Sequence, residues 1–146
     1  MSERLNMLID NKALQVQDNP VLQGNFAPVD IENSFDQLEK VKKFAVKHKI
    51  ILLIKRHNTA IINSDGMVWF NSTGNNALAK AGSGDVLTGI ICGFLAQGYA
   101  PLMAAQIGVF VHGKNADDFI KTNSPSTFSP EKQIENLPKT LYALGI

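Results

Sequence analysis

The sequence predicts an α/β fold, and three neighbouring stretches support that prediction. Residues 34–48 place apolar side chains at every third or fourth position, which is typical of an amphipathic helix. Residues 50–54 are consecutive aliphatic side chains, a pattern typical of a strand buried on both faces of a parallel sheet, although a short apolar run does not exclude a helix. Residues 71–97 pass from a strand end through a glycine-rich turn into an apolar helix. A helix followed by a buried strand indicates helices layered on a sheet.

Length and composition limit the classes of protein to consider. A chain of 146 residues with 45% hydrophobic content can bury one core and is short for two domains, so we expect one domain, or part of one, over residues 1–146. The net charge of +1 gives no support for binding nucleic acid or a membrane surface. The single cysteine, Cys92, excludes an intramolecular disulfide and favours a reducing, cytoplasmic location. Its apolar surroundings predict a buried helix residue.

The first third of the chain contains one clear element. Residues 1–32 keep no regular period, so we expect an irregular arm with a short helix near residues 2–10, and their charges are unlike a secretory signal. The helix over residues 34–48 has Ser34 and Gln37 spaced as a capping box at its start.

A β-hairpin is predicted between the aliphatic run and the glycine-rich turn. Residues 59–62 and 67–70 are short β-type runs, and Asp65-Gly66 between them supplies turn chemistry. The second run leads directly into residue 71, so the hairpin delivers the chain to the glycine-rich turn.

Two apolar helices are predicted after the turn. Residues 86–113 lack Asp, Glu, Lys and Arg, but Gly98 and Pro101 divide them into segments too short to span a bilayer, so we expect two helices buried in a soluble core. Pro101 suits the first turn of the second helix, which should end near residue 120. Gly89 and Gly93 predict close packing against a neighbour.

The C-terminal segment is predicted to contain two short helices. Residues 121–127 have the composition of a loop. Ser129-Pro130 can open a helix over residues 131–135, and Pro138 would then begin the last helix, over residues 138–144.

The glycine-rich turn has the features of an anion site. Backbone N–H groups at the start of a helix lack partners within the helix and attract phosphate, so those of residues 81–84 are candidates to bind one. Asp85 has two interpretations. It is an ordinary helix-capping residue, or it is a general base for a hydroxyl beside a bound phosphate.

These residues carry a resemblance to a known family. The run GSGDVLTGI at residues 82–90 resembles the G-x-G-D anion-hole signature of the ribokinase-like superfamily. The longer pattern NSTGN-x5-AGSGDVLTGII-x2-FLAQGY, followed by GVFVHGKNAD at residues 108–117, more closely resembles the carbohydrate kinase-related ADP/ATP-dependent NAD(P)H-hydrate dehydratases. The resemblance covers residue 50 to the C-terminus. Because family domains are nearly twice as long, it implies the C-terminal part of a three-layer α/β/α ribokinase-like domain.

The resemblance also implies functional residues. Asp85 would deprotonate the substrate hydroxyl, and the N–H groups of residues 81–84 would stabilise the moving phosphoryl group. Residues 55–59 resemble a K-G-x-x-T segment that contacts nucleotide phosphates and ribose, with Arg56 in place of the glycine; an exposed basic turn is the alternative. The implied nucleotide contacts are Lys55, Arg56, His57, Asn58, Thr59, Asn75, Ala81, Gly82, Ser83 and Gly84. For His112, packing is favoured over catalysis.

The activity implied by the resemblance is the ADP- or ATP-dependent dehydration of (S)-NAD(P)H-hydrate. Mg²⁺ would enter with the nucleotide phosphates, since no His/Cys cluster has the spacing of a metal site. A catalytically inactive nucleotide-binding fragment and a ribokinase-like small-molecule kinase are the alternatives. The expected partners are the hydrate, the nucleotide, and either further copies of the chain or a complementing N-terminal half.

Overall fold

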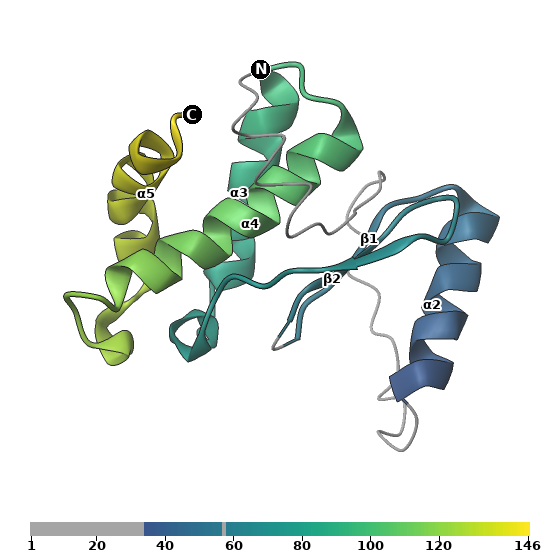
Figure 1. Cartoon of the computed structure of the whole chain (residues 1–146), viewed down its shortest axis with the longest axis horizontal. Coiled ribbons are helices and arrows are strands. Elements are labelled where there is room, and N and C mark those ends of the chain that lie inside the picture. Colours follow the sequence, from purple (N-terminus) through teal and green to yellow (C-terminus); the bar gives the residue numbers. More distant parts are fainter. Residues whose placement is uncertain (1–33, 57) are drawn as a thin grey trace.

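The structure is a computed structural model that describes residues 34–56 and 58–146, with side chains described from Leu38 onward. The predicted arm over residues 1–32, its short helix and the side chains of the predicted capping box lie outside this description. The elements, in chain order, are α2 (Ser34–His48), β1 (Leu52–Ile54), β2 (Ala60–Ile62), β3 (Val68–Phe70), the 3₁₀ turn η1 (Asn76–Leu78), α3 (Ser83–Ala96), α4 (Pro101–Phe119), the 3₁₀ turn η2 (Pro125–Thr127) and α5 (Pro130–Leu144) (Figure 1).

The described strands form an antiparallel sheet in the order β1-β2-β3. Ile61 pairs with Leu53 on one side and with Trp69 on the other. The predicted hairpin is confirmed, and Gly66 N–H closes its turn by donating to the Asn63 carbonyl at 2.9 Å. The parallel arrangement predicted for residues 50–54 is wrong among these strands. Only a short loop joins β1 to β2, whereas a parallel pair needs a crossover of roughly a dozen residues.

Helices cover both faces of the sheet, as an α/β/α arrangement requires. On one face, Ala45 of α2 packs with Ile50 and Ile62. On the other face, Ile61 packs with Leu87 of α3 and with residues of α4. Figure 1 shows the sheet between α2 and the α3–α4 pair. The aliphatic run is therefore apolar because helices lie on both sides, and the predicted α/β class is confirmed.

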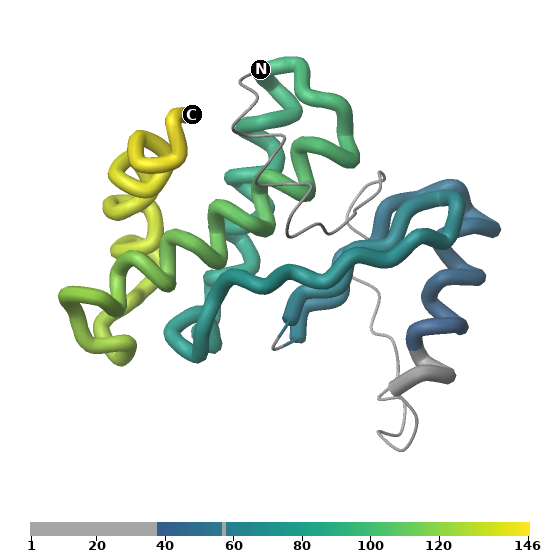
Figure 2. Tube along the Cα trace, in the orientation of Figure 1, coloured from purple at the N-terminus to yellow at the C-terminus, as the bar shows by residue number. Residues whose placement is uncertain are grey.

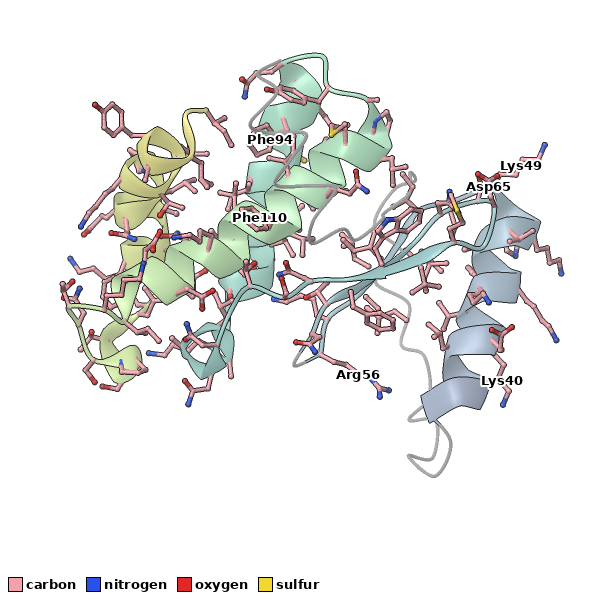
Figure 3. The ribbon with its side chains drawn as sticks, viewed as in Figure 1. Lys40, Lys49, Arg56, Asp65, Phe94 and Phe110 are labelled. Carbon is pink, nitrogen blue, oxygen red and sulfur yellow. The ribbon has the colours of Figure 1, made fainter. Side chains whose placement is uncertain are left out.

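The two apolar helices after the turn pack against each other and against α5. Val86, Ile90 and Phe94 form the buried stripe of α3, at the three-to-four-residue spacing of one helix face. Figure 3 shows Phe94 within this group of helices. No helix in the described ranges has the length and apolar character needed to cross a bilayer. The residues that meet this stripe are Ala104, Ile107, Val111, Leu137, Leu141 and Leu144.

Two predictions about the other face of α3 are wrong. Cys92 is exposed. It lies midway between the buried Ile90 and Phe94 in sequence, which places it on the opposite side of the helix. Gly89 and Gly93 have no close neighbour, because a Cβ at either would meet nothing within 4 Å in the described chain.

The C-terminal segment is one helix, so the prediction of two separate helices is wrong. Ser129 caps α5 by accepting a hydrogen bond from Lys132 N–H, as its position predicted, but the helix then continues through Pro138. Proline removes one backbone hydrogen bond and costs about 3 kcal/mol in a helix interior. Leu137 and Leu141 pack against the α3–α4 core on either side of Pro138, and this contact offsets the cost.

Candidate functional site

The glycine-rich turn leaves several N–H groups free at the start of α3. Gly82 has φ of +83°, and a Cβ there would lie 2.8 Å from Pro130 Cγ, so only glycine fits. Ser83 N–H donates to the Lys80 carbonyl, and Asp85 N–H donates to the Gly82 carbonyl. Among the described residues, no carbonyl accepts a hydrogen bond from the N–H of Ala81, Gly82 or Gly84. The turn can therefore offer these N–H groups to an anion.

Asp85 lies in the first turn of α3 with its side chain exposed. It does not cap the helix, because the N-cap residue is Gly82 and no side chain makes a capping hydrogen bond. A groove of about 850 Å³ between α3 and α5 begins at Gly82 and Asp85. The carboxylate is thus available to a ligand larger than phosphate, and the capping interpretation is not supported.

Lys55 at the end of β1 reaches the same turn from the sheet. Its Nζ lies 3.7 Å from the position that a Cβ on Gly84 would occupy. Partial burial lowers the pKa of Lys55, while the negative charge of Asp85 acts in the opposite direction. A cation and a carboxylate from separate elements therefore flank the free N–H groups.

The other predicted residues of the β1–β2 loop are placed differently. Arg56 and Asn58 are exposed and both make contacts within the protein. Figure 3 shows that the Arg56 side chain extends away from the start of α3. Thr59 is half-buried, and its backbone carbonyl accepts a hydrogen bond from Asn71 N–H at 2.9 Å. His57 lies outside the described residues.

The loop between β3 and η1 is fixed by α4, and the chain runs from it through η1 into α3 (Figure 2). Asn75 Oδ1 accepts from Ala77 N–H at 2.9 Å, and Asn75 Nδ2 donates to Asp117 Oδ1 at 2.8 Å. Asp117 Oδ2 accepts from Gly74 N–H at 2.9 Å. Both polar atoms of the Asn75 side chain thus have partners, and a nucleotide contact from this side chain would have to exchange one of them.

A buried polar cluster lies behind the glycine-rich turn. His112 Nε2 of α4 lies 3.2 Å from Ser83 Oγ and 3.2 Å from Gln133 Oε1 of α5. All three residues are buried, which confirms that His112 is packed. Burial first, and then the positive charge of Lys55, lower the pKa of His112 to about 4. Gln133 carried no sequence signal, because it is 21 residues from His112 in the chain.

Comparison with known proteins identifies the family. Residues 23–139 match the family model described as NAD(P)H-hydrate dehydratase. The chain belongs to this family. It is 40% identical over 109 residues to the bifunctional NAD(P)H-hydrate repair enzyme Nnr of Moorella thermoacetica, covering 75% of this chain and 21% of that protein. It is 36% identical over 101 residues to the ADP-dependent (S)-NAD(P)H-hydrate dehydratase of Bacillus subtilis, covering 69% and 37% respectively.

A solved structure of the NAD(P)H-hydrate dehydratase family agrees with the fold. The ADP/ATP-dependent enzyme from Bacillus subtilis, co-crystallised with ATP and Mg²⁺, superposes with a TM-score of 0.69 at 33% identity. The match covers 74% of this chain and 39% of that one. This chain thus spans well under half the length of these relatives.

This family member offers no cage of its own for a metal in the part of the chain that is described. No group of three or more His, Cys, Asp or Glu side chains gathers there in a way that could hold an ion. Mg²⁺ is typically held by substrate phosphates together with one or two carboxylates. The exposed Asp85 carboxylate, beside the N–H groups that would receive phosphate, suits that donor set.

Proposed function

We propose that this chain contributes the phosphoryl-binding and general-base part of an ADP- or ATP-dependent (S)-NAD(P)H-hydrate dehydratase. One observation carries the proposal: unpaired N–H groups at the start of α3 lie between Lys55 and the exposed Asp85. Membership of the dehydratase family supports it, as does the co-crystallisation of the similar Bacillus subtilis enzyme with ATP and Mg²⁺. The substrates are the hydrated NADH or NADPH and the nucleotide.

The residues of the turn would act together on the terminal phosphoryl group. Asp85 takes the proton from the hydroxyl of the hydrate, and the resulting oxygen attacks the terminal phosphorus while the bond to the nucleotide's bridging oxygen breaks. The N–H groups of Ala81, Gly82 and Gly84, together with Lys55, stabilise the charge on the moving group. Phosphate then leaves with the C–O bonding electrons and a ring proton is lost, which restores the nicotinamide ring.

The nucleotide would lie between the glycine-rich turn and the β1–β2 loop. Lys55 and the N–H groups of Ala81, Gly82 and Gly84 would face the phosphates. Ser83 stays a predicted contact within the turn, and Arg56, His57, Asn58 and Thr59 form the rest of the predicted contact segment. Asn75 stays a predicted contact at the far loop. Mg²⁺ enters with the phosphates and supplies further neutralisation of their charge when bound.

The chain matches well under half the length of its relatives, so the source of the remaining substrate contacts must be considered. We propose that further copies of the chain, or a complementing N-terminal half, supply the remaining substrate contacts in the cytoplasm. Native mass spectrometry distinguishes these arrangements. An assembly of copies has a mass that is a multiple of the mass of this chain, whereas a complementing half adds a polypeptide of different mass. A monomer with full activity would contradict both.

Recovery of NADH from its hydrate tests the activity. The protein is mixed with hydrated NADH, Mg²⁺ and either ADP or ATP, and the NADH absorbance is followed. We expect Asp85→Asn to lower the rate at least about a hundredfold, the lower range for a general base. Glu135→Gln is the control, since Glu135 is also an exposed acid on a helix, α5, but does not line the groove that begins at Asp85. Equal rates for both variants would refute the role of Asp85.

The same assay separates the alternative functions. Nucleotide binding without recovery of NADH would indicate an inactive binding fragment. A stable phosphorylated sugar or vitamin precursor would indicate a small-molecule kinase instead.

A further inference from the structure

The buried cluster of Ser83, His112 and Gln133 joins three helices at the back of the glycine-rich turn. Ser83 begins α3, His112 lies in the middle of α4, and Gln133 lies near the start of α5. The exposed fraction is 0% for Ser83, 4% for His112 and 0% for Gln133. Ser83, the member of the cluster in the turn, is held by His112 of α4, which in turn contacts Gln133 of α5.

The contacts select one form of the imidazole. Gln133 Oε1 can only accept a hydrogen bond, so the contact at 3.2 Å requires that His112 Nε2 carries the hydrogen. The same Nε2–H lies 3.2 Å from Ser83 Oγ, which then accepts as well. Gln133 thus sets the tautomer with which His112 holds Ser83.

This polar cluster costs more folding free energy than a set of apolar side chains filling the same space. In the described chain, Gln133 Nε2 is buried without a hydrogen-bond partner. Such an unsatisfied group costs about 1–3 kcal/mol, and apolar side chains of similar size would avoid that cost. Asn115 Nδ2 donates to the Gln133 backbone carbonyl at 2.7 Å and holds the backbone at this residue, while Gln133 Oε1 contacts His112.

We propose that His112 is a positioning residue that holds Ser83, and through it the N–H groups of Gly82 and Gly84, in the orientation that binds phosphate, with Gln133 fixing the tautomer of His112. This inference rests on the proposed function for the identity of the anion. Ser83 lies between the two glycines in the chain, so a shift of Ser83 moves both neighbouring peptide planes.

Calorimetric titration with Mg-ATP tests the inference on the whole 146-residue chain. Ser83→Ala and Gln133→Leu each remove one contact to His112, and each is expected to weaken Mg-ATP binding about tenfold, as expected for one misaligned hydrogen-bonding group. Gln133→Glu keeps an acceptor oxygen and is expected to recover most of the affinity. The matched control is Thr140→Val, which removes a buried contact to Asn115 Oδ1 between α4 and α5 without touching the turn.

A readout without nucleotide separates the inference from the proposed function. In ¹H–¹⁵N spectra, Gln133→Leu is expected to shift the Gly82 and Gly84 amide resonances, whereas Thr140→Val should leave them in place. Unchanged glycine resonances in Gln133→Leu, or equal loss of affinity in Thr140→Val, would overturn the inference. If the resonances shift but wild-type protein does not bind Mg-ATP, the positioning role stands and the nucleotide site is refuted.

Discussion

Lowering the pH from 7 to 5 is expected to destabilise the protein through His112. Burial, with a further contribution from Lys55, lowers the pKa of His112 from 6.5 to about 4 in the folded protein. Between these values the unfolded chain binds the proton more tightly than the folded chain does, so stability falls as the pH falls. Each pH unit below 6.5 lowers the free energy of unfolding by about 1.4 kcal/mol, so the loss at pH 5 is about 2 kcal/mol.

Urea unfolding at pH 7 and pH 5 measures this loss in the wild type and in His112→Gln. The variant lacks the titrating group, so its free energy of unfolding should fall by about 2 kcal/mol less than that of the wild type over this range. Carboxylates titrate in both proteins and cancel in the comparison. His48→Gln, which changes an exposed histidine of α2, is the control and should behave as wild type. Equal losses in the wild type and His112→Gln would refute the buried, neutral histidine.

Two further predictions concern the helices that support the site. Gly113→Ala should destabilise the protein by about 3 kcal/mol, because its Cβ would lie 2.6 Å from the Thr73 backbone carbonyl carbon. The control Gly93→Ala has open space around it and should be neutral or stabilising in the same thermal-unfolding assay. Pro138→Ala should raise the free energy of unfolding by up to about 3 kcal/mol, because it restores a helix hydrogen bond in α5. A lower midpoint in urea for this variant would show that the proline makes contacts that outweigh the missing bond.

Local chemistry in the sequence was sufficient for some elements. The Asp65-Gly66 pair identified the β2–β3 hairpin, because its turn is held by hydrogen bonds between near neighbours in the chain, such as those that Asn63 accepts from Asp65 N–H and Gly66 N–H. The glycine-rich turn placed the start of α3 correctly, since an N–H-rich helix start follows from Gly82 and its neighbours. The same short motif also predicted that Asp85 lies in the first turn of α3.

Contacts between distant residues decided what the sequence could not predict. The aliphatic run before Lys55 indicated burial on both faces but carried no information on strand direction. Pro138 indicated a helix boundary, yet packing of its neighbours on α3 and α4 kept α5 continuous. The contact between His112 and Gln133 joins two helices, and nothing in the sequence around either residue indicates that it contacts the other. Cys92 is different, because the spacing of the buried residues around it already placed it on the outer face of α3.

The middle of α4 supports both loops of the candidate site. Gly113 brings the Thr73 backbone against the helix, and Asp117 holds the Gly74 N–H. One residue before Gly113, His112 contacts Ser83 in the glycine-rich turn. A displacement of α4 would therefore move both loops together, which explains why a glycine, a buried histidine and a carboxylate lie near one another in this helix. The GVFVHGKNAD motif is thus better understood as support for the loops of the candidate site than as a source of groups that touch a ligand.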